Sequence, residues 1–194
     1  MDKKIIFATG NEGKMREIRE ILGDIGYELL SLKDAGIDID IVEDGETFEE
    51  NAIIKAKTVM EATGCLTLAD DSGLEIDYLG KEPGVHSARY MGENTPYRIK
   101  NQILLDRLHG VPAVVRTARF VCAVAAAFPD GRIEVRRGTI EGRIANKPAG
   151  ENGFGYDPIF YLPERGMTTA ELSPEEKNKI SHRARALEQI KEIL

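Results

Sequence analysis

The stretch Leu68-Ala69-Asp70-Asp71-Ser72-Gly73-Leu74 decides how the rest of this chain is interpreted. Small and apolar residues lead into two adjacent acids and a glycine, which predicts a short buried strand that ends at a sharp turn. In α/β proteins ligands sit beyond the carboxyl ends of strands, and Mg²⁺ takes one or two protein carboxylates while keeping waters and substrate phosphates. A turn cap would explain a single acid there. Two acids beside a serine favour a metal site.

The composition is that of a soluble protein with one domain, residues 1–194. Of the 194 residues 42% are hydrophobic and 30% are charged, which is ordinary for a globular chain with a sizeable core. No apolar run approaches the roughly 20 residues of a membrane span, and no signal-peptide core is seen, so we expect a cytoplasmic protein without a membrane partner. The net charge of −7 argues against nucleic acid and favours a small-molecule partner.

Cysteine usage points to a reducing compartment. Cys65 and Cys122 lie far apart in apolar segments, without the spacing of a zinc site. We therefore expect two reduced core residues and neither a disulfide nor zinc.

A glycine-containing loop follows the first predicted strand, residues 4–9. Gly10-Asn11-Glu12-Gly13-Lys14 opens a segment with apolar residues at helical spacing. The N–H groups and dipole at such a helix start favour an anion, and the side chains of Thr9, Asn11 and Lys14 add donors. The loop has neither Walker nor GxGxxG spacing. A plain strand-to-helix connection therefore explains it about as well.

An acidic run after two predicted extended pieces, 27–32 and 37–42, contains a further candidate ligand. Most of its acids are expected in a solvated loop and in the first turn of a capped helix. Glu43 is set apart because it closes an extended piece as Asp71 closes its own strand, so we expect the two strand ends to meet. Lys55, one turn into the helix, is in reach of a phosphate, although an exposed helical lysine explains it as simply.

The second half of the chain predicts a β-hairpin and two capped helices. The apolar runs 119–128 and 133–144 flank a turn at Pro129-Asp130-Gly131, which favours a structural hairpin. One helix is predicted to begin at Thr95-Pro96, and another at Ser173-Pro174-Glu175-Glu176, where a cap, a proline and an acid coincide.

The most loop-like stretch, residues 146–158, carries aromatic residues among glycines. A purine has a π-face that Phe154 could cover, and Asp157 could orient hydrogen bonds at the base or at metal waters. The alternative is that Phe154 and Tyr156 plug the core beneath the loop. The stretch by itself does not decide between the two.

Basic residues gather near the last predicted helix. Lys177, His182 and Arg183 fall on its polar positions, and Ser181 is placed to restart the helix and to aim the two residues after it at a ligand. Together the three basic side chains form a plausible pocket for the carbonyl and ring-nitrogen acceptors of a purine.

Taken in order, these stretches resemble the inosine triphosphate pyrophosphatase family, whose members are Mg²⁺-dependent nucleoside triphosphate pyrophosphatases that remove non-standard purine nucleotides. The match spans almost the whole chain, and the combination is far more specific than any one motif. The residues that carry it are Thr9-Gly10-Asn11-Glu12-Gly13-Lys14, Glu43-Asp44-Gly45, Thr47-Phe48, Glu50-Asn51-Ala52, Ala69-Asp70-Asp71-Ser72-Gly73-Leu74, Pro83-Gly84, Ser87-Ala88-Arg89-Tyr90, Gly153-Phe154-Gly155-Tyr156-Asp157-Pro158 and Ser181-His182-Arg183.

The resemblance implies an α/β fold with a long, bent, mixed β-sheet flanked by helices, two lobes around a central cleft, and a homodimer. It implies hydrolysis of ITP, dITP and XTP to the monophosphate and pyrophosphate. Carried over by position, Glu43 and Asp71 would hold Mg²⁺ with Asp70 nearby, and Asp71 would accept the proton. The triphosphate would be bound by Thr9, Gly10, Asn11, Glu12, Gly13, Lys14, Lys55 and Ser72, and the nucleoside by Phe154, Gly155, Tyr156, Asp157, Lys177, His182 and Arg183.

Two other functions compete with this interpretation. A related pyrophosphatase of the Maf type would act on pyrimidine or modified nucleotides, but the Phe154 loop and Ser181-His182-Arg183 argue against it. A non-catalytic nucleotide-binding module would have to retain Lys14, Glu43 and the acid pair without using them for chemistry.

Overall fold

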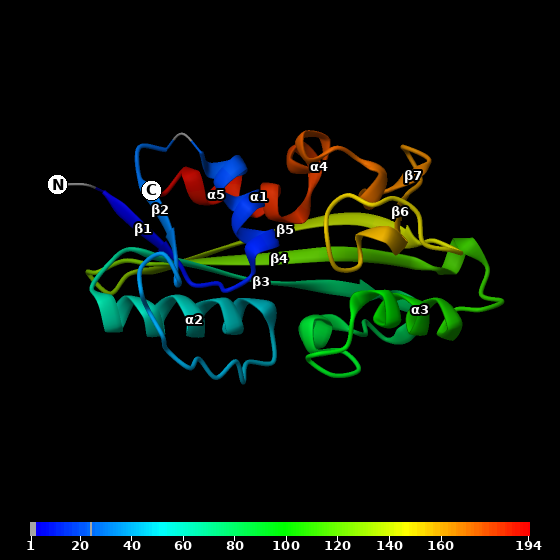
Figure 1. Cartoon of the computed structure of the whole chain (residues 1–194), viewed down its shortest axis with the longest axis horizontal. Coiled ribbons are helices and arrows are strands. Elements are labelled where there is room, and N and C mark those ends of the chain that lie inside the picture. Colours follow the sequence, from blue (N-terminus) through cyan, green and yellow to red (C-terminus); the bar gives the residue numbers. More distant parts are fainter. Residues whose placement is uncertain (1–2, 24) are drawn as a thin grey trace. The chain divides into compact units, whose positions relative to one another are not determined.

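The computed structural model describes residues 3–23 and 25–194 and contains one mixed sheet with flanking helices (Figure 1). Its strands follow the order β2-β1-β3-β4-β5-β6-β7. The chain divides into two compact units, of which unit 1 comprises the residues up to Ser72 with 122–138 and 182–194, and unit 2 comprises 73–121 and 139–181. Three long strands contribute residues to both units: β3 (Thr67–Ile76), β4 (Thr117–Ala127) and β5 (Ile133–Ile144).

Unit 1 is built on parallel strands. β1 (Lys4–Phe7) pairs in parallel with β2 (Glu28–Ser31) on one side and with β3 on the other. Parallel neighbours need crossover connections, and the helices α1 (Glu12–Leu22) and α2 (Phe48–Thr63) supply them. The predicted strand, glycine loop and helix at the start of the chain are confirmed.

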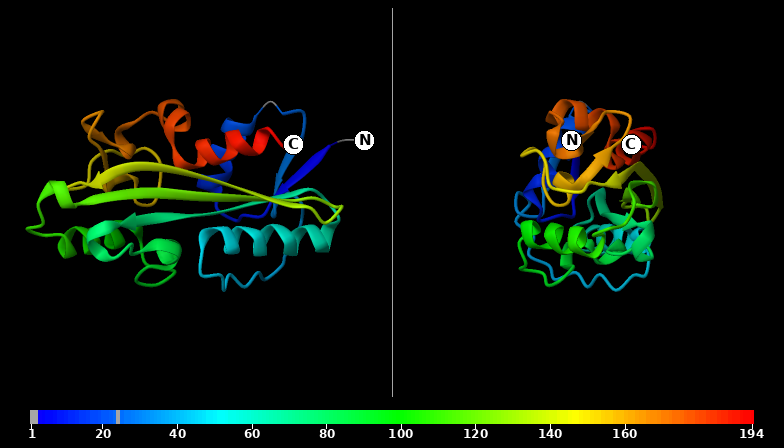
Figure 2. Two further views of the ribbon diagram at one scale, coloured as in Figure 1. Left: turned by 180° about the vertical axis from the view of Figure 1, so that it is seen from behind. Right: turned by 90° about the vertical axis from the view of Figure 1, so that its right-hand side faces the viewer.

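Helices cover both faces of the sheet in unit 1. α1 and α5 (His182–Lys191) lie side by side on one face, and α2 lies on the other (Figures 1 and 2). Strands covered on both faces read as nearly continuous apolar runs, and the residues here fit that rule. One buried cluster joins the strands to α1 and α5, and its fully buried members include Ile5, Phe7, Ile18, Leu68, Cys122, Val124, Leu187 and Ile190.

Unit 2 contains the short strands at one end of the sheet order. β6 (Phe160–Leu162) pairs antiparallel with β5 and with β7 (Met167–Thr168). Its helices are α3 (Tyr97–Arg107) and α4 (Pro174–Ile180), and α4 begins with the predicted capping box. A separate buried cluster stabilises this unit, with Leu74, Leu104, Tyr156, Phe160 and Leu172 among its members.

The predicted strand end at the acid pair is wrong. β3 continues without interruption through Asp70 and Asp71 as far as Ile76, so Leu74–Ile76 belongs to the same strand rather than to a separate one. Gly73 lacks a side chain but keeps the chain extended, and the apolar residues on either side are buried. The glycine therefore marked a position within the strand and not a turn.

The second extended piece, 37–42, forms no strand. Its isoleucines are half-buried and alternate with exposed residues, but no strand among the described residues pairs with their backbone. The other elements agree better with the sequence. The hairpin is confirmed as β4 and β5, and the helix after Thr95 is confirmed as α3, with Pro96 as its N-cap.

The mixed α/β fold is thus confirmed, whereas two lobes around a central cleft stays a prediction. Both cysteines are free thiols, and Cys122 is buried as expected, but Cys65 is only half-buried. Across the described residues, no helix combines the length and apolar character that crossing a bilayer requires.

Candidate active site

Asp70 and Asp71 point to opposite faces of β3, because successive side chains of a strand alternate. Asp70 faces the side of α1 and α5, where Lys14 and Arg183 contact it. Asp71 faces the side of α2, where Asn51 and Lys55 contact it. The continuous strand therefore gives the two adjacent carboxylates separate partners, which a sharp turn would not have done.

Asp70 is an almost fully buried anion surrounded by cations. Its Oδ2 lies 3.1 Å from Lys14 Nζ and 3.4 Å from a guanidinium nitrogen of Arg183, and it accepts a 2.8 Å hydrogen bond from Ser72 Oγ. Burial alone would raise the pKa of Asp70, but Lys14, Arg183 and Lys55 outweigh that effect and hold it well below its usual range. Asp70 is therefore ionised at neutral pH.

Asp71 differs from Asp70 in the direction of its pKa shift. Burial raises its pKa to about 6, although Lys55 and Lys14 lower it. Asn51 Nδ2 donates to Asp71 Oδ2 at 3.1 Å, and Oδ1 accepts the Ser72 N–H at 3.1 Å. A carboxylate with a pKa near the working pH is suited to accept a proton. The pair thus contains one fixed anion and one titratable group.

Glu43 and Asp71 share a contact with Lys55, although neither acid closes a strand as the sequence predicted. The Lys55 ammonium lies 2.7 Å from Glu43 Oε1 and 4.0 Å from Asp71 Oδ1. Burial lowers the pKa of Lys55, but Asp70, Asp71 and Glu43 raise it by more, so the lysine stays charged. The position between these two carboxylates therefore already accommodates a cation.

The donor set fits Mg²⁺ bound together with a phosphate substrate. Across residues 3–23 and 25–194 no three His, Cys, Asp or Glu side chains converge as a closed cage. Mg²⁺ does not need one, since it is usually held by one or two carboxylates, waters and substrate phosphates. The buried Oδ1 of Asp70 has no hydrogen-bond partner among the described residues, so it is left for a water or another donor.

The loop 9–14 has the form of an anion site at the start of a helix. Asn11 caps α1 by accepting the Lys14 N–H at 3.0 Å, and Thr9 Oγ1 accepts the Asn11 N–H at 3.1 Å. Gly10, Asn11 and Glu12 are exposed, while Lys14 reaches back to Asp70. The loop thus combines N–H groups, the positive end of the helix dipole and one ammonium.

Arg183, which the sequence predicts for the base pocket, lies beside the acid pair, and its role toward the base stays a prediction. Its guanidinium donates to Ser72 Oγ at 3.0 Å and forms a buried ion pair with Glu17 of α1. His182, the first residue of α5, is also buried. The restart of the helix after Ser181 is confirmed and explains why both residues face inward.

In unit 2 the aromatic loop holds its own shape through Asp157. Asp157 Oδ2 accepts the Phe154 N–H at 2.9 Å and a 2.6 Å bond from Lys177 Nζ, while Oδ1 accepts a 2.8 Å bond from Thr169 Oγ1. A side chain at Gly153 would lie 2.1 Å from Asp157 Oδ2. These contacts assign Asp157 to holding the loop and the lysine in place.

Phe154 and Tyr156 have different surroundings: Tyr156 fits the alternative of a core plug, whereas stacking of Phe154 on a purine stays a prediction. Tyr156 is buried, and its hydroxyl donates to the Ser87 carbonyl at 2.6 Å, which makes it the core plug. Phe154 is only half-buried, and the Lys177 ammonium lies 4.9 Å from its ring centroid. An aromatic face and a cation are thus available side by side.

Sequence reasoning missed Asn51 as a site residue. It is 2% exposed and joins two segments, because its Oδ1 accepts the Gly45 N–H at 2.8 Å while its Nδ2 holds Asp71. The signal was present in the sequence, since Asn51 is a polar residue on the face of α2 that carries Phe48, Ala52 and Ala56 inward.

Comparison with known proteins gives a consistent result over the whole chain. The Ham1 family model matches residues 5–193. A dITP/XTP pyrophosphatase of Bacillus licheniformis is 50% identical over 192 residues, which cover 99% of this chain and 98% of that protein. One of Thermus thermophilus is 50% identical over 184 residues, covering 95% and 88%. The solved Ham1 protein of Staphylococcus aureus superposes with a TM-score of 0.88 at 42% identity, covering 98% and 97%.

These matches confirm the family resemblance that the motifs indicated. They extend over both units and over every stretch that carried the resemblance. The chain belongs to the Ham1 family.

Proposed function

We propose that this protein hydrolyses the non-standard purine nucleotides dITP, XTP and ITP to the monophosphate and pyrophosphate in a Mg²⁺-dependent reaction. The observation that carries the proposal is the cluster of charges at β3. Lys14 of the loop 9–14 contacts Asp70, and Lys55 contacts both Glu43 and the titratable Asp71. Relatives that are 50% identical over 98% and 88% of their own length, and that are named dITP/XTP pyrophosphatases, support the substrate class. The reaction would remove deaminated purines before they enter DNA or RNA.

The residues of unit 1 provide the phosphate and metal chemistry of the proposal. Glu43 and Asp71 would hold Mg²⁺. Asp70, which is oriented by Lys14 and Ser72, lies on the other face of β3. When bound there, Mg²⁺ neutralises charge on the phosphate oxygens. The loop 9–14 and Lys55 add N–H donors and a second ammonium for the triphosphate.

Hydrolysis requires attack by one water on the α-phosphorus. Asp71 accepts the proton of this water, the new P–O bond forms, and the bond to the β-phosphate oxygen breaks. Pyrophosphate leaves with the electrons of the broken bond, and Lys14 stabilises its charge. No covalent nucleophile is needed, and Cys122, whose buried thiol lies near Asp70, takes no part.

Base selection against ATP rests on donors toward the 6-oxo group of hypoxanthine and xanthine, whereas GTP, which shares this group, must be rejected at its 2-amino group. Phe154 offers a stacking face, and Lys177, His182 and Arg183 are the proposed donors. ATP carries an amino group at this position, so a buried donor would lose its partner, at a cost of roughly 1–3 kcal/mol. Discrimination of about one to two decades between dITP and ATP follows.

The test is pyrophosphate release from dITP, XTP, ITP, GTP, ATP and dTTP, each with and without Mg²⁺. We expect rapid Mg²⁺-dependent release from the first three and slow release from the others. A preference for dTTP would instead indicate the Maf-type activity. Tight nucleotide binding without turnover would indicate a non-catalytic module.

The proposal includes a homodimer acting on a free nucleotide in the cytoplasm. Light scattering would then give twice the chain mass of 21.5 kDa.

A further inference from the structure

We propose that helix α3 sets the conformation of the base loop, residues 153–157, with Asn101 and Tyr97 as positioning residues for nucleotide recognition. This inference rests on the proposed function, in which Phe154 of the loop covers the purine. α3 lies outside the motifs that carried the family resemblance, and neither residue was a candidate from the sequence. All residues concerned belong to unit 2.

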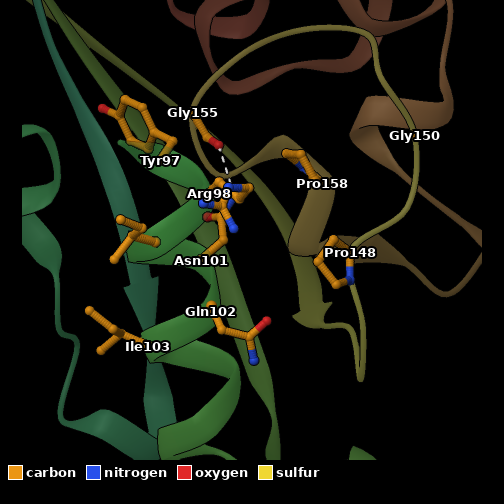
Figure 3. A pocket seen from close by; sticks show the side chains of 10 residues that line it. Tyr97, Arg98, Asn101, Gln102, Ile103, Pro148, Gly150, Gly155 and Pro158 are labelled. Carbon is orange, nitrogen blue, oxygen red and sulfur yellow. Dashed lines mark hydrogen bonds between the residues drawn. The ribbon is translucent and has the colours of Figure 1, made fainter. Parts of the chain in front are cut away.

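Asn101 connects the helix directly to the loop backbone. The residue is 4% exposed, and its Nδ2 donates to the Gly155 carbonyl at 3.2 Å, as Figure 3 shows. Gly155 immediately follows Phe154 and adopts φ +65°, a left-handed conformation that favours glycine. A donor on this carbonyl therefore fixes the Gly155–Tyr156 peptide plane, which directly follows the residue after Phe154 in the loop.

Tyr97 provides the second contact, one helical turn before Asn101 on the same face of α3. Its ring meets the Tyr156 ring edge to face, with centroids 5.1 Å apart and an interplanar angle of 89°. A Cβ at Gly155 would come within 3.6 Å of the Tyr97 ring, so the loop backbone passes directly over this side chain. Tyr97 thus packs against Tyr156 and lies next to the Gly155 backbone.

Apart from these two contacts, the side of the loop that faces α3 borders open space. A groove of about 460 Å³ separates α3 from Pro148, Gly150 and Pro158, with Asn101 and Gln102 in its wall (Figure 3). Where a groove replaces packed side chains, the few contacts that cross it determine the position of the loop. The opposite side of the loop is held by Asp157, which fixes Phe154 through its N–H but leaves the Gly155 carbonyl to α3.

The consequence is an effect on the base loop of unit 2 and not on the acid pair of unit 1. Loss of the Asn101 bond disturbs how Phe154 meets the base, while the acid pair and the lysines of unit 1 keep their own contacts. The effect is therefore expected in KM rather than in kcat.

The experiment compares Asn101→Asp and Asn101→Ala with Gln102→Ala. The aspartate has nearly the shape of the asparagine but lacks the N–H donor, and Gln102 is an exposed neighbour that bonds only to Asp106 of the same helix in the described structure. We expect both Asn101 variants to raise KM for dITP about tenfold, with kcat within about twofold of the wild type. Gln102→Ala should leave both constants unchanged.

Amide hydrogen exchange of the segment 152–157 is measured on the same proteins and does not depend on turnover. We expect faster exchange in this segment in the Asn101 variants and wild-type exchange in Gln102→Ala. Unchanged exchange and unchanged KM in both Asn101 variants would overturn the positioning role. If the Asn101 variants exchanged faster but the wild type cleaved no nucleotide, the positioning of the loop by α3 would be retained and the proposed function would be contradicted.

Discussion

Asp70 and Asp71 show how neighbouring residues of one type acquire different chemistry. Lys14 and Arg183 hold the pKa of Asp70 below its usual range despite burial, whereas burial dominates at Asp71 and raises its pKa to about 6. The cause is the alternation of side chains along β3, which gives each acid a different helix as its neighbour. The sequence indicates the pair, but the assignment of partners required the three-dimensional structure.

Asn51 supports a prediction about the metal site. In Asn51→Ala, Asp71 loses its 3.1 Å donor and the Gly45 N–H loses its acceptor, so both proposed ligand segments are released. We expect the Mg²⁺ concentration for half-maximal activity to rise about 10- to 100-fold. Lys57→Ala, which removes an exposed ion pair on the same helix, should leave the Mg²⁺ titration unchanged. Equal titrations for the two variants would remove Asn51 from the site.

The two cysteines predict contrasting reactivity. Burial, together with the nearby Asp70, raises the pKa of Cys122 to about 12, so its thiol is both inaccessible and protonated. Cys65 is half-buried. Alkylation of the native protein at pH 8 should therefore modify Cys65 and spare Cys122, and peptide mass spectrometry reports both positions. Modification of Cys122 before unfolding would show that the core around Asp70 opens.

At the level of elements, local chemistry predicted boundaries well where caps were present. Asn11, Thr47 and Ser173 each accept a backbone N–H from the residue three positions later, and the helices begin as expected. The errors occurred where pairing depends on residues far along the chain. Residues 37–42 alternate like a strand but pair with no other strand in the described part of the chain. Gly73 is a residue typical of turns but lies within β3.

The packing of α5 on β5 depends on one glycine. A Cβ at Gly138 would lie 2.2 Å from the His182 carbonyl oxygen and 2.6 Å from the Ala186 nitrogen, both of which are backbone atoms. Gly138→Ala must therefore displace the helix that carries His182 and Arg183. We expect a loss of roughly 1–3 kcal/mol or more, and a melting temperature lower by about 2–4 °C per kcal/mol.

Gly10→Ala is the matched control for stability, because nothing lies within 4 Å of a Cβ at Gly10 and its φ is not in the left-handed region. Calorimetry should show a wild-type melting temperature for this variant. If Gly138→Ala melted at the same temperature as Gly10→Ala, the close approach of α5 to β5 would be contradicted.

At the scale of the whole molecule, unit 2 has its own charge network with a definite pH dependence. Asp77 accepts hydrogen bonds from Arg119 and Thr117 and pairs with Lys81, and these contacts hold its pKa well below the usual value. A depressed pKa in the folded state adds stability above the unfolded pKa of about 4, and that stability is lost as the pH falls toward the folded value.

Asp77→Asn tests this dependence. The difference in melting temperature between wild type and variant should be fully present at pH 7 and should shrink below about pH 4. Because Asp77 is partly exposed, added salt should reduce the difference as well. A difference that is the same at pH 7 and pH 3 would show that the ionised carboxylate is not what stabilises the unit.

The central claim, that Asp71 on β3 carries out Mg²⁺-dependent pyrophosphate release, is tested most directly by comparing wild type and Asp71→Asn on dITP at saturating Mg²⁺. The substitution keeps the shape of the side chain and removes its capacity to accept a proton. We predict a fall in kcat of about 10²-fold or more with an unchanged circular dichroism spectrum. A folded Asp71→Asn enzyme with near-normal turnover would contradict the account.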